Sequence, residues 1–280
     1  FVASAFCAML VGPTPVFADV DPDSGNITAE SIGKAVTNRT RAVIPVHLAG
    51  WPADMPAIMR LAEQRGIKVI EDCAQAPGAS IGGRAVGSFG DAAAFSFCQD
   101  KIITTGGEGG FVSFRDPSAY EWAWSFKDHG KDRARALTPS SDPAEFRWLH
   151  DRVGTNWRLT GPQAAIGLIQ LGKLDQWVKI RERNARIWID ALDNVPNLRV
   201  PVPDESMQHA WYKLYFHLEL PEGEVTKLRK RITVRAQDAG LRLFTGSCSE
   251  IYREAAFRDL PLPDCPIAHR LGGTSLMVEV

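Results

Sequence analysis

The stretch GDAAAFSFCQDKIITTGGEGGFV, residues 90–112, places a strand-like run, one lysine and a glycine cluster in immediate succession. Its first apolar run predicts a buried strand over residues 91–97, and the residues around the last glycines predict another over 108–114. Lys101 lies between these two strands. A lysine in that place is either a solvent-exposed residue of a turn or a reactive group at the end of a strand.

Upstream of this stretch, short apolar strands alternate with helical patterns. Strands are predicted over residues 14–20, 41–50 and 67–72, and helices over 29–37 and 54–66. Strands separated by helices of this length form crossover connections. The pattern predicts an α/β fold, with a mainly parallel sheet sandwiched by helices.

The second part of the chain has a different pattern. Residues 162–192 are continuously helical in periodicity, residues 210–220 alternate like a strand, and residues 225–240 read as a helix with a glycine end. We therefore predict two domains. A large domain covers residues 1–180, and a smaller α+β domain covers residues 181–280.

Composition excludes several classes of partner. The chain has 280 residues, 32 basic and 33 acidic, so no overall field attracts nucleic acid or an anionic membrane. No stretch approaches the roughly 20 apolar residues of a membrane span. The cysteines form no C-x-x-C pair, which argues against a zinc site or a disulfide framework and favours a reducing cytoplasm. The five cysteines are Cys7, Cys73, Cys98, Cys248 and Cys265.

Asp72 and Lys101 are the candidate chemical groups. Asp72 ends the predicted strand 67–72, at the edge where open parallel sheets bind ligands, although a lone carboxylate there can also be a helix cap. A lysine against apolar walls becomes a nucleophile and forms Schiff bases with carbonyl compounds or pyridoxal phosphate. The pyridine nitrogen of that cofactor stays protonated beside a carboxylate. Glycines would let the backbone approach the cofactor closely; these are Gly106, Gly107, Gly109 and Gly110.

Four segments in this order resemble the DegT/DnrJ/EryC1/StrS family of pyridoxal-phosphate-dependent sugar aminotransferases, which have the aspartate-aminotransferase fold. They are VIEDCAQAPGAS (69–80), the stretch 90–112, DHGKD (128–132) and GTNWRLTGPQAAIGLIQLGKLDQW (154–177). Each segment alone is a weak signal, but the ordered set is specific. The resemblance extends over nearly the whole chain.

The resemblance implies a role for five residues. Lys101 would bind pyridoxal 5'-phosphate as a Schiff base and carry protons between cofactor and substrate. Asp72 would pair with the pyridine nitrogen, Gln75 would lie near the phenolic oxygen, and Ser96 would bind the phosphate. Asn156, in GTNWR, would reach across a dimer interface to the phosphate of the partner's cofactor. Ser96 could instead be a strand hydroxyl, and Asn156 a turn former.

The implied activity is transfer of an amino group from glutamate or a similar donor to a nucleotide-linked keto sugar, in a cytoplasmic homodimer with shared active sites. A dehydratase branch of the family carries histidine in place of Lys101, so the lysine favours amino transfer. The alternatives are a related cofactor enzyme with a non-sugar ketone substrate or dehydratase activity, and a non-catalytic dimer partner. His47 and Cys98 are interpreted as structural residues.

The family has a phosphate-binding GT-x-A-L helix start upstream of the position that matches Phe1. We expect the chain to be truncated at both ends. Helix N-termini are strong phosphate sites, so we also expect the chain as given to bind the cofactor poorly.

Overall fold

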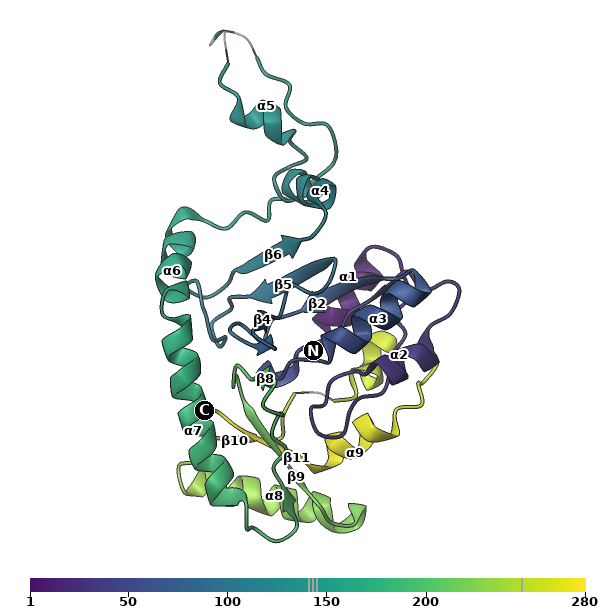
Figure 1. Ribbon diagram of the computed structural model, residues 1–280, viewed down its shortest axis with the longest axis vertical. Helices are drawn as coiled ribbons and strands as arrows, with labels where there is room; N and C mark the ends of the chain where they lie inside the picture. The colour runs from purple at the N-terminus through teal and green to yellow at the C-terminus, as the bar shows by residue number, and fades with distance from the viewer. Residues whose placement is uncertain (141, 143, 145, 248) are drawn as a thin grey trace.

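The computed structural model describes all residues except 141, 143, 145 and 248. The first sheet has four strands, whose order in space is β1, β2, β5 and β6 (Figure 1). The first three are parallel and β6 is antiparallel to β5. The strands are β1 (Ala42–Val43), β2 (Lys68–Asp72), β5 (Ala92–Ser96) and β6 (Gly110–Phe114).

Two helices cover one face of this sheet, α2 (Ala29–Ala35) and α3 (Met55–Arg65). Helix α3 begins where the Asp54 side chain accepts a hydrogen bond from the third helical N–H, and ends at Gly66 with φ 62°. Its apolar residues recur at helical spacing and therefore face the sheet together. The cluster they form includes Ile32, Met55, Ile58, Ala62, Val69 and Phe89.

The other face of the sheet is less covered. Helix α1 (Ala3–Leu10) lies against it at the end of β2, where Ser4 contacts Asp72. Farther along, Ile70 is 36% exposed and Val112 is 52% exposed. Strand β2 thus alternates between a buried and an open face, as its side-chain period of two requires.

The predicted strand over residues 14–20 is wrong. The segment pairs only through an isolated bridge between Val20 and Ile27. Its Asp19 instead accepts hydrogen bonds from backbone N–H groups in the first turn of α9 (Pro266–Thr274). The apolar pattern is satisfied by contacts with the far end of the chain, which local periodicity does not reveal.

Helices α4 (Pro117–Lys127) and α5 (Arg133–Leu137) lead into an arm that projects from the body of the molecule (Figure 1). The chain returns along the arm to α6 (Gly161–Leu171) and α7 (Leu174–Leu192). The single helical stretch predicted over residues 162–192 is therefore two helices, separated at Gly172 and Lys173.

The second sheet is antiparallel, with the strand order β10, β11, β9 and β7. Helices α7 and α8 contribute side chains to the core on this sheet. Its elements are β7 (Leu198–Arg199), β9 (Leu214–Leu218), α8 (Glu222–Asp238), β10 (Leu243–Phe244) and β11 (Ser275–Val278). The remaining elements are η1 (Leu48–Gly50), β3 (Ser80–Ile81), β4 (Arg84–Ala85), β8 (Met207–Gln208), η2 (Ile251–Arg253) and η3 (Ala255–Phe257).

Helix α7 runs across the predicted domain boundary at residue 180. Leu174, at its start, packs on the core beside the first sheet, whereas Ala185 belongs to the core of the second sheet. The division into residues 1–180 and 181–280 stays a prediction, and one continuous helix spans the predicted boundary.

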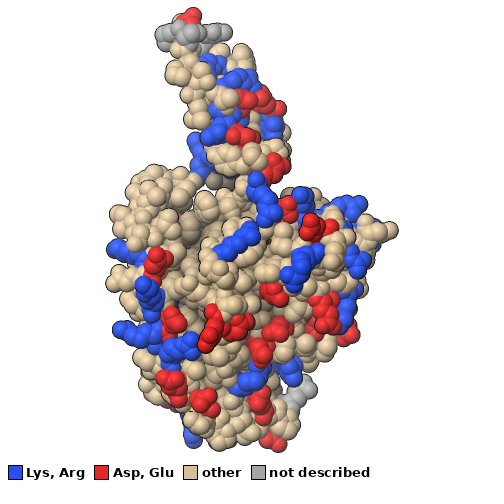
Figure 2. All heavy atoms as spheres, viewed as in Figure 1, with Lys and Arg blue, Asp and Glu red and all other residues tan. Residues whose placement is uncertain are grey.

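Charge is mixed over the surface. Figure 2 shows basic and acidic side chains interspersed over the body and the arm on the viewed face. Among the residues that the structure describes, none of the helices combines the length and the apolar character that crossing a membrane takes.

Candidate active site

Asp72 is the last residue of β2, at the edge where the parallel strands end. Its backbone N–H donates to the carbonyl of Pro45 at 2.8 Å, and the next N–H, of Cys73, donates to the carbonyl of Ala94 at 2.8 Å. These bonds hold the end of β2 between its two neighbours. Asp72 therefore lies at the ligand-binding edge of a parallel sheet, as predicted.

The Asp72 carboxylate is half-buried and has one donor on each oxygen. The Ser4 hydroxyl donates to Oδ2 at 2.6 Å, and the backbone N–H of Ala74 donates to Oδ1 at 3.1 Å. A carboxylate offers about four lone-pair positions, so Asp72 can accept a further hydrogen bond. Sequence reasoning missed Ser4, because no motif or periodicity marks a contact between residues 68 positions apart.

Gln75 follows Asp72 by three residues and is also half-buried. Its Oε1 accepts a hydrogen bond from the backbone N–H of Ala49 at 2.6 Å. Ala49 has φ 58°, a left-handed conformation within η1. The amide oxygen is thus engaged, and the amide N–H groups donate to no described residue. Gln75 remains a hydrogen-bond donor beside Asp72.

Lys101 lies in the turn after β5, where its N–H donates to the carbonyl of Cys98 at 3.1 Å. The Nζ atom is 4.9 Å from the centroid of the Tyr212 ring. It makes no hydrogen bond or ion pair with any residue that the structure describes. Ile102, the next residue, is 4% exposed. The turn therefore presents an amine without an acidic partner beside buried apolar groups.

A single buried cluster connects the Asp72 and Lys101 regions. Cys73 and Ala76, which directly follow Asp72 and Gln75 in the chain, pack in the same cluster as Ile102. Strands β2 and β5 are adjacent and parallel, so their ends meet at one edge. Asp72, Gln75 and Lys101 thus all lie at the edge of the sheet where β2 and β5 end.

Ser96 is the last residue of β5 and is half-buried. Its Oγ accepts a long hydrogen bond, 3.4 Å, from the backbone N–H of Cys98. The hydroxyl proton donates to no described residue. Ser96 can therefore donate a hydrogen bond at the edge where Asp72 lies.

The glycines after Lys101 serve the packing of the chain itself. A Cβ at Gly109 would lie 2.1 Å from Oγ1 of Thr105, and one at Gly110 would lie 2.8 Å from the carbonyl oxygen of Phe95. These contacts within the chain already require glycine at both positions, without the close approach of a cofactor that the sequence analysis expected. The preceding pair adopts positive φ: Gly106 (81°) and Gly107 (128°).

Asn156 lies apart from the other predicted site residues, in the arm. It forms a bridge with Asp128, and its Oδ1 accepts a hydrogen bond from Nε of Arg158 at 2.9 Å. Arg158 also lies 3.6 Å from an Asp128 oxygen and 3.4 Å from Nε2 of His129. Because Oδ1 faces Arg158, the amide N–H groups of this exposed asparagine are available to an anion.

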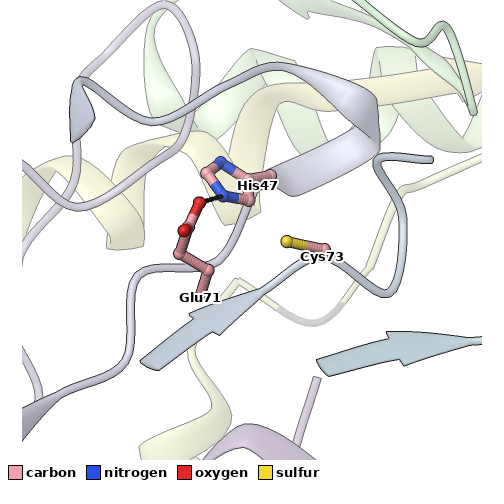
Figure 3. Close-up of side chains that lie close together, drawn as sticks. All are labelled: His47, Glu71 and Cys73. Atoms are coloured by element: carbon pink, nitrogen blue, oxygen red, sulfur yellow. Dashed lines mark hydrogen bonds and ion pairs between the residues drawn. The ribbon is translucent and has the colours of Figure 1, made fainter. Parts of the chain in front are cut away.

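His47, Glu71 and Cys73 form a buried cluster whose possible ligand atoms lie within 4.8 Å of one another (Figure 3). Nδ1 of His47 accepts from the Ala53 N–H at 3.0 Å, so Nε2 carries the proton and lies 3.2 Å from Oε2 of Glu71. Burial, and then the charges of Glu71 and Asp72, raise the pKa of the Cys73 thiol above its usual range. Both imidazole nitrogens are occupied and the thiol keeps its proton, which does not fit a metal site.

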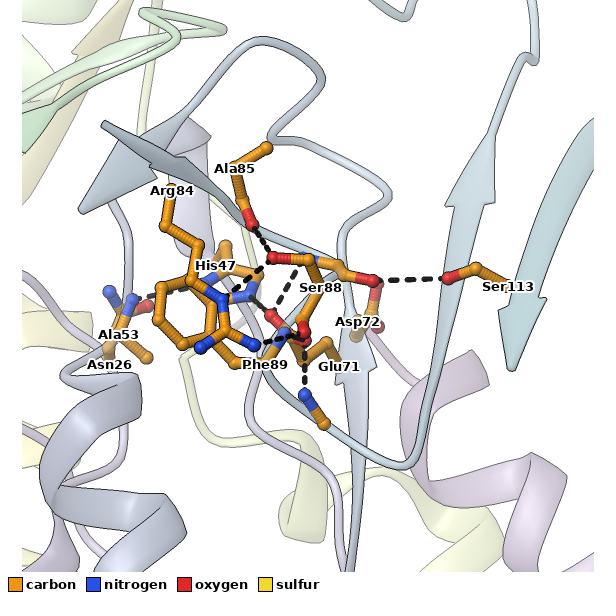
Figure 4. Close-up of polar contacts among 12 residues, drawn as sticks. Asn26, His47, Ala53, Glu71, Asp72, Arg84, Ala85, Ser88, Phe89 and Ser113 are labelled. Atoms are coloured by element: carbon orange, nitrogen blue, oxygen red, sulfur yellow. Dashed lines mark hydrogen bonds and ion pairs between the residues drawn. The ribbon is translucent and has the colours of Figure 1, made fainter. Parts of the chain in front are cut away.

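Glu71 is fully buried and accepts hydrogen bonds on both oxygens (Figure 4). Oε1 accepts from the N–H groups of Phe89 at 2.7 Å and Gly90 at 2.6 Å, and Oε2 accepts from Gly87 at 2.7 Å. Burial acts to raise the pKa of Glu71, but hydrogen bonds from His47 and these N–H groups lower it below its ordinary value. Glu71 is a structural carboxylate, for which the sequence analysis made no prediction.

The residues at the sheet edge fit pyridoxal phosphate. The aldehyde requires an amine that is not held by another group, and the Lys101 amine makes no hydrogen bond or ion pair with any described residue; its contact is the Tyr212 ring. The pyridine nitrogen requires a carboxylate with a free lone pair, and Asp72 has one donor on each oxygen. Gln75 and Ser96 add donors for oxygen atoms.

Comparison with known proteins identifies the family to which this chain belongs. The residue pattern of the DegT/DnrJ/EryC1/StrS aminotransferase family matches residues 1–265. A UDP-N-acetyl-3-dehydro-alpha-D-glucosamine 3-aminotransferase of Acidithiobacillus ferrooxidans is 37% identical over 228 residues, which are 81% of this chain and 58% of that protein. A GDP-perosamine synthase of Caulobacter vibrioides is 40% identical over 80% of this chain and 57% of its own length.

The fold agrees with this match. The crystal structure of an aminotransferase from Psychrobacter cryohalolentis superposes with a TM-score of 0.94 at 45% identity, covering 100% of this chain and 73% of that one. This agreement confirms the predicted α/β fold class and the resemblance noted from the motifs. The chain spans somewhat more than half the length of the curated relatives it matches. It belongs to the DegT/DnrJ/EryC1/StrS aminotransferase family.

Proposed function

We propose that the protein is a pyridoxal-phosphate-dependent aminotransferase that moves an amino group from glutamate, or a similar donor, to a nucleotide-linked keto sugar. One observation carries the proposal: the Lys101 amine makes no hydrogen bond or ion pair with any described residue, and it follows β5 at the same edge of the sheet where Asp72 ends β2. Family membership supports it, and two relatives are named for UDP-linked and GDP-linked sugars.

In this proposal, each of the four residues at the sheet edge has its own role in holding or using the cofactor. Lys101 binds the cofactor aldehyde and moves a proton at the substrate carbon. Asp72 accepts the hydrogen bond of the pyridine N–H and keeps that nitrogen protonated. Gln75 donates to the phenolic oxygen, and Ser96 donates to the phosphate. When bound there, the cofactor supplies an electron-withdrawing ring that stabilises negative charge on the substrate carbon.

The proposal extends to a homodimer with shared sites. Asn156 would donate its amide N–H groups to the phosphate held by the partner subunit, because its oxygen already faces Arg158. The arm that carries it exposes large apolar side chains, as interaction surfaces do; these include Phe146 (71%), Trp148 (81%) and Trp157 (71%). A reducing, cytoplasmic location is supported by the described cysteines, which are all free.

The presence of Lys101 favours amino transfer over dehydration, since the task of binding the aldehyde needs an amine. The test is incubation of the purified full-length protein with pyridoxal phosphate, glutamate and a panel of UDP-, GDP- and dTDP-linked keto sugars. We expect an amino sugar identified by mass. Lys101→Ala and Lys101→Arg should both lose the product, because arginine keeps the charge but its guanidinium does not lose a proton to become a nucleophile.

The matched control is Lys34→Ala, which removes an exposed lysine paired with Glu30 at 2.7 Å. It should leave turnover unchanged. Amino sugar production by Lys101→Arg at the unsubstituted rate would overturn the proposal. A dehydrated product in place of an amino sugar would overturn the reaction type and leave the cofactor assignment standing.

A further inference from the structure

Two residues 112 positions apart in the chain meet beside Lys101. The hydroxyl of Tyr212 donates to Oδ2 of Asp100 at 2.6 Å. The thiol of Cys98 donates to Oδ1 of the same carboxylate at 2.8 Å. Asp100 immediately precedes Lys101, and Tyr212 lies just before β9 of the second sheet. The hydrogen bond therefore ties the turn that carries the reactive amine to the other half of the molecule.

The Tyr212 ring has a fixed position. Tyr212 is 6% exposed and packs in the buried cluster with Ile102. Two lysine Nζ atoms, of Lys101 and Lys213, each lie 4.9 Å from the ring centroid. Lys213 is also held by Glu279 at 2.8 Å, whereas Lys101 has no ion-pair partner among the described residues. The Tyr212 ring is thus the contact that locates the Lys101 amine, and the charge of the amine also acts on the neighbouring Asp100 carboxylate.

The donor and acceptor in this pair keep their roles. Burial, and then the hydrogen bond to Asp100, raise the pKa of Tyr212 far above its ordinary value, so the phenol keeps its proton. Burial acts to raise the pKa of Asp100, but hydrogen bonds from Cys98 and Tyr212 and the charge of Lys101 lower it. A protonated phenol and an ionised carboxylate form a charge-assisted hydrogen bond.

We propose that Tyr212 and Asp100 form a clamp that positions the Lys101 amine for its bond to the cofactor aldehyde; the clamp rests on the proposed function. A free lysine side chain has many rotamers, and restricting them in advance lowers the entropic cost of the reactive geometry. In the step that benefits, the amine nitrogen adds to the aldehyde carbon. Water then leaves with the carbonyl oxygen and both protons of the amine.

The clamp makes Tyr212 and Asp100 positioning residues, and it gives the second half of the chain a part in the chemistry. The experiment measures how fast Lys101 is labelled. The purified full-length protein is mixed with pyridoxal phosphate, samples are reduced with borohydride at intervals, and labelled peptides are quantified by mass spectrometry. Lys230, an exposed lysine of α8, serves as the internal reference in each sample.

Four variants separate the parts of the clamp. Tyr212→Phe keeps the ring and removes the hydrogen bond, Asp100→Ala removes the acceptor, and a double variant combines them. Tyr215→Phe is the matched control, because it removes a tyrosine hydroxyl that accepts from the Ser247 N–H at 2.8 Å. Near-ultraviolet circular dichroism confirms that each variant is folded.

We expect Tyr212→Phe and Asp100→Ala each to slow labelling of Lys101 by about tenfold relative to Lys230, the factor that loss of one hydrogen bond to a charged group produces. The double variant should be no slower than either single one, since both remove the same bond. Tyr215→Phe should match the unsubstituted protein.

Other results overturn the clamp in distinguishable ways. Independent effects that multiply in the double variant would show that Tyr212 and Asp100 do not act through one bond. Unchanged labelling in Tyr212→Phe, with Lys101 still labelled faster than Lys230, would overturn the clamp alone. If Lys101 of the unsubstituted protein is labelled no faster than Lys230, the proposed function fails and the clamp fails with it.

Discussion

Glu71 and Asp72 are neighbours in one strand, yet their side chains have opposite surroundings. Glu71 is fully buried under four hydrogen bonds, whereas Asp72 is half-buried and keeps lone pairs for another donor. The alternation of side chains along a strand produces this difference. One carboxylate stabilises the loop around Gly87, and the other is available for chemistry.

At this scale we predict that Glu71→Gln destabilises the fold by on the order of 1–3 kcal/mol or more, because it removes the charge from a buried group that accepts four hydrogen bonds and leaves a buried N–H donor unpaired. The Gln amide would also place N–H groups against the N–H donors of Gly87 or Gly90. Urea unfolding followed by circular dichroism at neutral pH measures the change. The unsubstituted protein should also lose stability in acid through this group.

The direction of this pH dependence of stability follows from the lowered pKa of Glu71. The folded state binds the proton more weakly than the unfolded state, so the contribution is present above the unfolded-state pKa and is lost as pH falls through the folded-state pKa. Glu71→Gln should flatten that acid dependence below the ordinary carboxylate pKa. An equally steep acid dependence in the variant would show that other groups cause it.

At the scale of elements, α7 determines how the two cores are joined. Its first turn packs near the loop that follows β2, and its later turns pack on the second sheet. Gly78 in that loop has φ 90°, and a Cβ there would lie 2.6 Å from Cγ2 of Val178 in α7. The absence of a side chain at Gly78 is therefore what allows the helix to approach.

We predict that Gly78→Ala lowers the free energy of unfolding by more than the strain of its backbone conformation alone explains. Gly83 also has positive φ, 77°, but no atom lies within 4 Å of its Cβ position, so Gly83→Ala is the matched control. The control should lose about 1 kcal/mol, and Gly78→Ala a further 1–3 kcal/mol, roughly, from overpacking. Thermal or urea unfolding of both variants gives the difference. Equal losses would mean that α7 shifts without cost.

At the scale of the whole molecule, Asn156 pairs with Asp128 at the end of α4, the helix from which the arm projects (Figure 1), whereas Asp72 ends β2 and Lys101 follows β5. Within one chain, no hydrogen bond among the described residues links Asn156 to Asp72 or Lys101. A second copy of the chain, placed with its arm against the sheet edge, would complete the site.

Subunit mixing tests this arrangement. Lys101→Ala alone should be inactive, and Asn156→Ala alone should be weakened by about tenfold or more, the loss of a hydrogen bond to an anion. In a mixed dimer, one site regains both Lys101 and Asn156 from different chains. A mixed dimer has one complete site of two, and random reassociation of equal amounts makes about half of the dimers mixed, so we expect amino sugar formation to rise toward about a quarter of that of the unsubstituted dimer. No recovery would place Asn156 and Lys101 in the same chain's site.

The sequence by itself determined the fold class, the end of β2 at Asp72, the place of β5 to within one residue at each end, and the candidate groups Asp72 and Lys101. Alternating apolar strands and helices, and the ordered motifs, encode these features within a few neighbouring residues. The same local rules wrongly predicted a strand over residues 14–20, since a strand also needs a partner from elsewhere in the chain.

Only the tertiary structure decided which groups surround the candidate residues. The contact of Ser4 with Asp72 spans 68 positions, and that of Tyr212 with Asp100 spans 112. Helical and strand periods relate residues only a few positions apart, so such partners carry no local signal. They are set when the sheet, the helices and the second half of the chain pack together, and that packing gives Asp72 and Lys101 their hydrogen-bond and ring contacts.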